Sequence, residues 1–370
     1  MTTKSIVSVL MTNYNSERFI EETIKSVLSQ SFQDFEFVIV DDCSSDSSYG
    51  YLKKIQDSRL SIYQNKQNLG QTKSLNIGLK LAQGEFVARM DADDLAFPHW
   101  LQEQVNFIQK HPACAVVSAQ AAVVDAHSRL QKIYYSPQNM NEIIIRSLTE
   151  SPINHVGSIM RRDTILSVGG YDENYKIAAD YDLWGKLIRG GYAMTSNPKI
   201  LVGVRVHGYS VSQLERRKAD IVEIRRIMKK NIDQFVSAPI TEEQVQLLSC
   251  LFFDEGALNF DEFKQAIDIF DRICRQIKPV VAGSLAVKWQ HKESQVAFLK
   301  RIYLEIHQEN FQSVRKVSVL GIKRFGLASP FLAFYLLSLG GNFILAKASL
   351  LYEGFLKLKT FLKIRRLRLV

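Results

Sequence analysis

The chain has 370 residues, of which 46% are hydrophobic, so it is long enough for two domains and apolar enough for a buried core. Its four cysteines form no CxxC pair, which argues against a zinc site or a disulfide framework and favours a reducing cytosol. The net charge of +9 is concentrated in residues 314–370, which carry +10, while the first 313 residues together carry −1. A near-neutral body with a basic tail predicts that the tail binds an anionic surface and that the protein does not bind nucleic acid.

The first apolar run, Ile6 to Met11, has the length and continuity of a strand that is covered on both faces. Six residues are too few for the core of a signal peptide, so we expect a cytoplasmic protein. The run ends in a polar loop with Thr12 and Tyr14, and the Tyr14 ring could belong to the core or stack on a base. Ser16 is placed to cap the helix that follows.

Three more buried strands are predicted from the runs Phe35–Val40, Leu60–Tyr63 and Phe86–Met90, with a helix before each of them. This alternation predicts a parallel sheet with right-handed crossovers, and such sheets bind ligands beyond the carboxyl ends of their strands. The polar or turn-forming residues expected at that edge are Thr12, Tyr14, Asp41, Asp42, Asn68, Gly70, Asp91 and Asp93. Asp42 alone could also be a simple helix cap.

The stretch Asp91-Ala-Asp-Asp94 follows the last of these strands and is the most informative part of the sequence. Asp91 and Asp93 leave the strand on the same side, because side chains alternate along a strand. Crowded carboxylates repel one another unless a cation lies between them. The stretch is therefore either a solvated acidic loop or a site for Mg²⁺ or Mn²⁺, with phosphate oxygens completing the metal's shell. Paired aspartates also occur in phosphoacceptor domains and phosphohydrolases, but the threonine and lysine partners of those folds cannot be placed here.

Small apolar residues from Ala115 to Val124 predict strands with a bend, and His155 precedes a further short strand. A lone histidine of this kind is either structural or functional. Gly169-Gly170 predicts a turn before a helix that begins near Asp180 and packs Leu183 and Trp184 inward. Asp180 could be an ordinary helix cap, since acids in the first turn complement the helix dipole.

A later strand, Lys199 to Val206, ends in an Arg-x-His pattern that contains His207. By itself this histidine could be a rim residue bonded to backbone.

These motifs together resemble family 2 glycosyltransferases, over about residues 5–212. The segments that carry the resemblance, in the family's order and spacing, are Val9–Asn15, Val38–Asp42 with Ser44–Asp46, Asn68–Gly70, Asn76–Gly78 and Met90–Asp94. The resemblance implies an α/β fold of the GT-A type, which is a Rossmann-like, mainly parallel nucleotide-sugar domain. It also implies inverting transfer from a nucleotide-diphosphate sugar, most simply a UDP-sugar, of the kind used in bacterial surface-polysaccharide synthesis.

The resemblance further implies roles for single residues. Thr12, Tyr14 and Asp42 would contact the nucleotide base, Asp91 would lie near the ribose, and Asn68, Gly70 and Lys73 would complete the donor site. Asp93, with His207, would bind Mn²⁺ or Mg²⁺. Asp180 aligns with the base that deprotonates the acceptor, although Ala179 stands where the family has a glutamate. The acceptor-side candidates are His155, Gly170 and Asp182.

From Gln213 onward helical periodicity replaces the strand pattern, and the resemblance ends. Helices are predicted at 214–235, 241–253, 261–277 and 284–304, the second with a capping box, Thr241-x-x-Gln244. We therefore divide the chain into a glycosyltransferase domain at 1–212, a helical extension at 213–313 and a tail at 314–370. The extension could be a lid, an acceptor platform or a module through which the protein oligomerises.

The tail contains 22 uncharged residues between Arg324 and Lys347, which is long enough to span a bilayer. Pro330 and the pair Gly340-Gly341 interrupt this segment and favour an interfacial position instead. A basic amphipathic helix follows Lys347, and such helices lie in the headgroup plane of an anionic leaflet. We expect a peripheral protein on the inner face of the cell membrane; a true span and packing onto the soluble body are the alternatives.

The sequence thus predicts a metal-dependent, inverting glycosyltransferase. It would add a sugar to a lipid-linked glycan acceptor during O-antigen, capsule or exopolysaccharide assembly. Two other classes stay open. A nucleotidyltransferase should carry a glycine-rich basic loop after its first strand, which Thr12-Asn-Tyr-Asn15 lacks. A non-catalytic nucleotide-sugar-binding or membrane scaffold protein would need no base.

Overall fold

The computed structural model describes residues 5–208, 219–252, 258–277, 316–317 and 320–321. The chain divides into two compact units, Met1–Gln234 and Phe235–Val370. The apolar and basic segments of the predicted tail, and the predicted helix at 284–304, lie outside the described residues.

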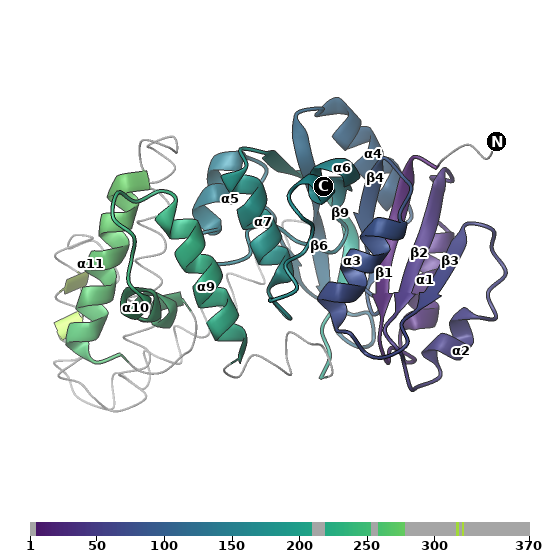
Figure 1. The fold of residues 1–370 in the computed structure, drawn as a ribbon, viewed down its shortest axis with the longest axis horizontal. Helices are drawn as coiled ribbons and strands as arrows, with labels where there is room; N and C mark the ends of the chain where they lie inside the picture. The colour runs from purple at the N-terminus through teal and green to yellow at the C-terminus, as the bar shows by residue number, and fades with distance from the viewer. Residues whose placement is uncertain (1–4, 209–218, 253–257, 278–315, 318–319, 322–370) are drawn as a thin grey trace. The chain divides into compact units, whose positions relative to one another are not determined.

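The first unit is built on one mixed sheet. Its strands are β1 (Val7–Asn13), β2 (Phe35–Asp41), β3 (Leu60–Gln64), β4 (Phe86–Arg89), β5 (Leu95–Ala96), β6 (Cys114–Val124), β7 (Leu130–Tyr134), β8 (Ile159–Arg161) and β9 (Ala193–Arg205). Among the described residues the strand order is β3-β2-β1-β4-β8-β6-β9-β5, with β7 paired to β6 (Figure 1). The first four strands are parallel, as predicted, and β8 joins β4 in the antiparallel sense.

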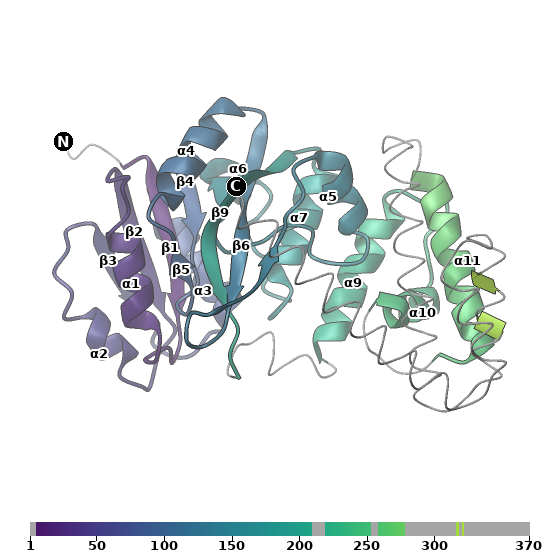
Figure 2. The same ribbon diagram turned by 180° about the vertical axis from the view of Figure 1, so that it is seen from behind.

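Helices cover both faces of this sheet. Those of the first unit are α1 (Ile20–Leu28), α2 (Ser48–Leu52), α3 (Gln71–Leu81), α4 (Trp100–Lys110), α5 (Met140–Arg146), α6 (Arg162–Ser167), α7 (Ala179–Arg189) and α9 (Ala219–Asp233). Helix α1 covers one face of the parallel strands and α3 covers the other, as opposite views show (Figures 1 and 2). This two-sided cover explains why the strands are continuous apolar runs.

Strand β1 shows the same division residue by residue. Val7, Val9 and Met11 belong to one core cluster with the apolar face of α1. Leu10 points the other way, against Gly78 of α3, where a Cβ atom would collide with the Leu10 side chain. All of these β1 side chains are buried, and the buried Ser8 between them donates to Glu36 at 2.6 Å.

Two local expectations were wrong. Ser16 does not cap α1 with its side chain: the helix begins at Ile20, and the Ser16 carbonyl oxygen accepts from the backbone N–H groups of Phe19 and Ile20. The Ser16 hydroxyl donates instead to Asn13. The region predicted as bent strands is the single strand β6, with irregular pairing to β9 around Gln120.

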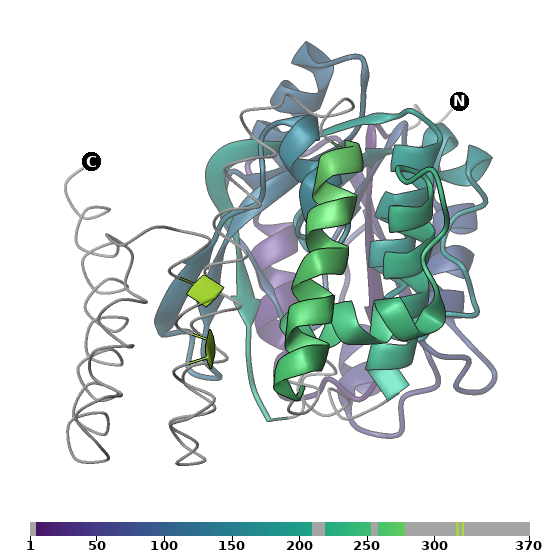
Figure 3. The ribbon, with the colours of Figure 1, turned by 90° about the vertical axis from the view of Figure 1, so that its left-hand side faces the viewer.

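The described part of the second unit contains α10 (Glu242–Phe252) and α11 (Phe260–Ile277), which lie side by side (Figure 3). The predicted capping box is confirmed. The Gln244 N–H donates to the Thr241 hydroxyl and the Thr241 N–H donates to the Gln244 side chain, both at 3.2 Å. None of the described helices is both long and apolar enough to cross a membrane.

Gly84, just before β4, gives a test of how closely β1 and β4 are packed. A Cβ at Gly84 would lie 2.6 Å from the backbone nitrogen of Ser8, so Gly84→Ala should lower the free energy of unfolding by about 1–3 kcal/mol. Gly50, within α2, is the matched control, because nothing lies within 4 Å of its Cβ position. Gly50→Ala should be neutral or raise stability by about 0.4–1 kcal/mol. Urea unfolding of both variants measures this, and equal stabilities would contradict the packing described.

Candidate active site

The ends of β1, β2 and β3 are joined by the carboxylate of Asp41. It is fully buried and accepts from the Asn13 side chain at 2.6 Å, from the Ser44 hydroxyl at 2.6 Å and from the Gln64 side chain at 3.1 Å. Asn13 and Gln64 are the last residues of β1 and β3, and Ser44 lies in the loop after β2. Asp41 therefore fixes the geometry of this edge of the sheet rather than facing a ligand.

Asp42, only 3% exposed, shapes the loop that follows β3. One carboxylate oxygen accepts from the Asn65 side chain at 2.7 Å and from the Leu69 N–H at 2.8 Å, and the other accepts from the Gly70 N–H at 2.8 Å. Gly70 has φ +88°, a conformation that glycine adopts at little cost. The contact of Asp42 with a base stays a prediction.

The other predicted donor residues lie along the same edge with different exposure. Tyr14 is 52% exposed, which makes its ring available for stacking and argues against a place in the core. Thr12 is buried, and Asn68 is exposed, its side chain accepting from the Gly70 N–H at 3.1 Å. Lys73 is exposed on the first turn of α3.

The acidic stretch Asp91–Asp94 begins next to a buried arginine. Arg89, at the end of β4, is fully buried and forms an ion pair with Asp91. Asp91 also accepts from the Gln71 side chain at 3.3 Å. Burial raises the pKa of Asp91 against the opposing effect of the Arg89 charge. The guanidinium thus keeps one carboxylate ordered at the strand end, where the ribose contact is predicted.

Asp93 and His207 are brought together although 114 residues separate them. The Nε2 atom of His207 lies 2.9 Å from an Asp93 carboxylate oxygen, and about a third of the Asp93 side chain is exposed (29%). Asp94 turns inward, 3% exposed, and accepts from the backbone N–H of Arg205 at 2.7 Å. Burial first, and then the neighbouring aspartates, raises the pKa of Asp94 well above its ordinary value.

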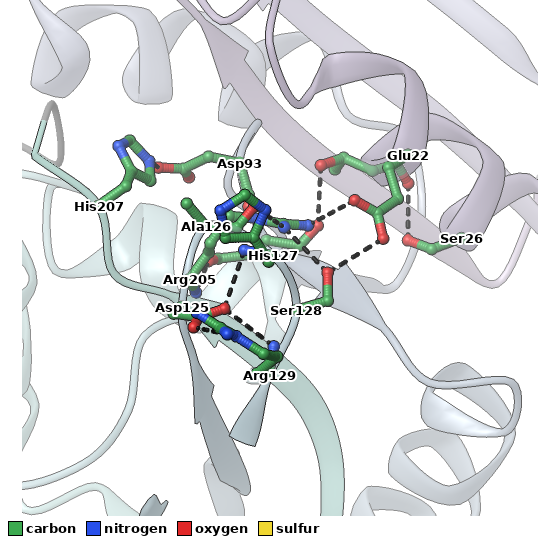
Figure 4. Close-up of polar contacts among 12 residues, drawn as sticks. Glu22, Ser26, Asp93, Asp125, Ala126, His127, Ser128, Arg129, Arg205 and His207 are labelled. Atoms are coloured by element: carbon green, nitrogen blue, oxygen red, sulfur yellow. Dashed lines mark hydrogen bonds and ion pairs between the residues drawn. The ribbon is translucent and has the colours of Figure 1, made fainter. Parts of the chain in front are cut away.

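Arg205 connects this stretch to the rest of the domain (Figure 4). Its buried guanidinium donates to the Asp93 carbonyl at 2.8 Å, to the Ser128 hydroxyl at 3.0 Å and to Glu22 at 2.7 Å. The Phe19 ring lies against it, 4.7 Å from the guanidinium carbon, and 4.6 Å from the His207 ring. One side chain therefore joins the acidic stretch, α1 and the β6–β7 turn.

Asp180 is the second residue of α7. Its carboxylate accepts from the Ser151 hydroxyl at 3.1 Å. Burial is the main reason why the pKa of Asp180 is raised, and the charge of Asp91 raises it further. The charge of Asp91 thus acts on the Asp180 carboxylate across the site.

Two of the acceptor-side candidates have internal partners. The Nε2 atom of His155 lies 2.8 Å from the Tyr171 hydroxyl, and burial, with the charge of Arg89, holds the pKa of His155 well below its ordinary value. Gly170 has φ +64°, and a Cβ there would lie 2.8 Å from the Asn76 side-chain oxygen. In this structure both residues stabilise the protein around the site.

Asp182 is fully buried, and its carboxylate faces Lys186 and Lys230, each at 3.4 Å. This position lies between α7 and α9, and an acceptor-side role for Asp182 stays a prediction. In the structure Asp182 joins the two helices.

Sequence reasoning missed three residues that hold the site together. Arg89 and Arg205 are charged residues within apolar strand runs, and that mismatch was a usable signal. Ser151 gave none, because its contact with Asp180 comes from packing between segments 29 residues apart.

Among the described residues no group of three or more histidine, cysteine, aspartate or glutamate side chains could hold an ion. Asp93 and His207 supply one carboxylate oxygen and one imidazole nitrogen at adjacent positions.

The chain is similar in sequence to known proteins. A family model described as Glycosyl transferase family 2 matches residues 8–168. An uncharacterised glycosyltransferase of Haemophilus influenzae is 30% identical over 243 residues, which cover 63% of this chain and 75% of that protein. The chain therefore belongs to glycosyl transferase family 2.

Two further likenesses refine the comparison. The Escherichia coli protein WfaP, named as a UDP-Glc:alpha-D-GlcNAc-diphosphoundecaprenol beta-1,3-glucosyltransferase, is 26% identical over 56% of this chain and 80% of its own. Residues 1–349 of S. aureus TarS, in a crystal structure with UDP-GlcNAc, superpose with a TM-score of 0.53 at 20% identity, covering 81% of this chain and 91% of that chain. The latter confirms the predicted fold class.

Proposed function

We propose that this protein is an inverting, metal-dependent hexosyltransferase that moves a sugar from a UDP-sugar to a hydroxyl of a lipid-linked glycan during surface-polysaccharide biosynthesis. The observation that carries the proposal is the row of polar side chains at the ends of the parallel strands; the Asp180 carboxylate is near enough for the charge of Asp91 to raise its pKa. The printed name of WfaP, with a UDP-sugar donor and a diphosphoundecaprenol acceptor, supports the substrate classes.

The donor is proposed to bind along the ends of β1 to β4. Tyr14 offers an exposed ring for the base, the loop shaped by Asp42 follows, and Asp91 stands at the end of β4 over Arg89. The diphosphate would lie between Asp93 and the first turn of α3, where Lys73 is exposed. This arrangement places the positive charge of Lys73 and the N-terminus of α3 where an anionic group needs them.

Asp180 is proposed to take the proton from the acceptor hydroxyl. Its raised pKa makes the carboxylate a better proton acceptor than an exposed aspartate, and the Ser151 hydroxyl orients it. A single displacement needs one such base. The Ala179 that precedes it leaves no second carboxylate at the position where the family has a glutamate.

Asp93 and His207 fit a divalent cation that is bound mainly through substrate phosphates, because such ions use one or two protein ligands and leave the rest of the shell open. A carboxylate oxygen beside an imidazole nitrogen suits Mn²⁺, and the carboxylate alone suits Mg²⁺. When bound, the ion would neutralise charge on the departing nucleotide. Arg205 holds the Asp93 backbone in place for this role.

Attachment to an anionic membrane surface, location on the inner face of the cell membrane, and oligomerisation through the helical region stay predictions from the sequence. The basic and apolar segments on which the first two depend lie outside the described residues.

The proposal is tested by measuring UDP release from UDP-glucose, UDP-galactose, UDP-N-acetylglucosamine and UDP-glucuronic acid, each with MnCl₂ or MgCl₂. We expect turnover of at least one member of this panel by transfer to water, and faster turnover with an undecaprenyl-diphosphate-linked sugar added. An absence of both turnover and binding across the panel would contradict a UDP-sugar donor.

Asp93→Asn should abolish transfer and metal-dependent binding of UDP while leaving the fold intact, because a partly exposed carboxylate is replaced by an amide of the same shape. UDP binding by calorimetry with and without MnCl₂, together with the thermal midpoint, measures this. Asp163→Asn, at a side chain that is 96% exposed on α6, is the matched control and should behave as wild type. Undiminished wild-type turnover in excess chelator would rule out the metal.

Asp180→Asn should lower the rate by about 10²–10⁴-fold, with UDP affinity unchanged, since only the proton acceptor is removed. In the wild type the rate should fall as the pH drops through the pKa of Asp180, and the raised pKa places this fall above the ordinary carboxyl value of about 3.9. The pH profile of kcat/KM for the panel's best donor measures it. Loss of UDP affinity in Asp180→Asn would instead place this residue in the donor site.

A further inference from the structure

Helix α9 lies beyond the segment matched by the family model, yet it contacts the backbone just before Asp180. The Glu223 carboxylate accepts from three successive backbone N–H groups: Lys176 at 2.9 Å, Ile177 at 3.0 Å and Ala178 at 3.2 Å. Backbone N–H groups at and just before the start of a helix have no hydrogen-bond partner within that helix. A carboxylate there is also favoured by the helix dipole.

A second contact fixes α9 against α7. The Asn231 side chain is buried; it accepts from Arg189 of α7 at 2.8 Å and donates to the Ser147 carbonyl at 2.9 Å. At Gly185 a Cβ atom would collide with the Asn231 amide, so the two helices approach closely there (Figures 1 and 2). The Tyr181 hydroxyl donates to the same Ser147 carbonyl at 2.7 Å.

These contacts hold both segments that determine where the Asp180 carboxylate lies. One is the start of α7, whose preceding backbone is bound by Glu223. The other leads from Ser147 to Ser151, the residue that donates to Asp180. The loop before α7 is held at its other end by Thr72 of α3, which donates to the Tyr175 carbonyl at 2.6 Å.

From this arrangement we propose that Glu223 is a positioning residue for Asp180, and that α9 completes the acceptor side of the active site. The inference rests on the function proposed above. The hydrogen bonds of the Glu223 carboxylate go to the backbone of residues 176–178 and not to the donor edge. Loss of Glu223 should therefore impair the step that needs Asp180 and spare donor binding.

The test compares Glu223→Ala and Glu223→Gln with wild type in UDP release from the panel's best UDP-sugar. The alanine variant should lose about 10–100-fold in kcat, because a displaced catalytic group is costly even over a short distance. The glutamine variant should lose less, since its amide oxygen can still accept. The KM for the UDP-sugar and the dissociation constant of UDP with MnCl₂ should not change in either variant.

Two measurements separate positioning from general stability. Amide hydrogen exchange should speed up at residues 176–178 in Glu223→Ala, while peptides from β1 and β4 exchange as in wild type. Asp233→Asn, which alters the ion pair with Lys229 on the same helix, is the matched control and should keep the wild-type kcat.

The inference is wrong if Glu223→Ala exchanges faster at 176–178 but keeps its kcat, or if kcat and UDP affinity fall together. Where the alanine variant does not fold, the kcat of Glu223→Gln decides, and a wild-type value overturns the proposal. Asp180→Asn in the same assay tells the two hypotheses apart. Full activity of Asp180→Asn would refute the proposed base, whereas an inactive Asp180→Asn beside a fully active Glu223→Ala would refute only the role of Glu223.

Discussion

Two buried arginines make the acidic segment Asp91–Asp94 possible. Burial and mutual repulsion raise the pKa of both terminal aspartates of this segment, which means that its charged state is unfavourable by itself. Arg89 offsets this cost of charge through its ion pair with Asp91. Arg205 supplies hydrogen-bond donors: its guanidinium donates to the Asp93 carbonyl, and its backbone N–H donates to the Asp94 carboxylate. Arginine suits both places, because it stays charged when buried and offers five donors.

The parallel half of the fold could be predicted closely from the sequence, since burial on both faces leaves a continuous apolar run. The predicted run Ile6–Met11 is strand β1, Val7–Asn13, and Phe35–Val40 is β2, Phe35–Asp41. The short strand predicted after His155 is β8, Ile159–Arg161, but nothing in its three residues indicates that it pairs antiparallel with β4. The Ser16 cap failed for a related reason: a nearby partner, Asn13, takes the hydroxyl, and no pattern in the sequence reveals that competition.

The site was predictable where its residues directly follow strands, and less so elsewhere. The topology alone predicted that the strand-end residues would meet at one edge. The pairing of Asp93 with His207 depended on family resemblance, because 114 residues separate them. Ser151 and Glu223 could not be found by either route, since each acts through a contact between distant segments and neither stands in a recognisable motif. Packing, rather than local pattern, selects such residues.

Asp180 and Asp182 show how packing decides what a motif leaves open. Two residues apart on α7, their side chains leave the helix about 200° apart around its axis. Asp180 accepts from the Ser151 hydroxyl, and burial, with the charge of Asp91, raises its pKa. Asp182 faces inward, fully buried, within 4.0 Å of three cationic groups, two from α7 and one, Lys230, from α9. The same residue type is thus proposed as a base on one face and is an internal ion-pair partner on the other. Since α9 contacts both the loop before Asp180 and the carboxylate of Asp182, the difference between the two aspartates depends on α9.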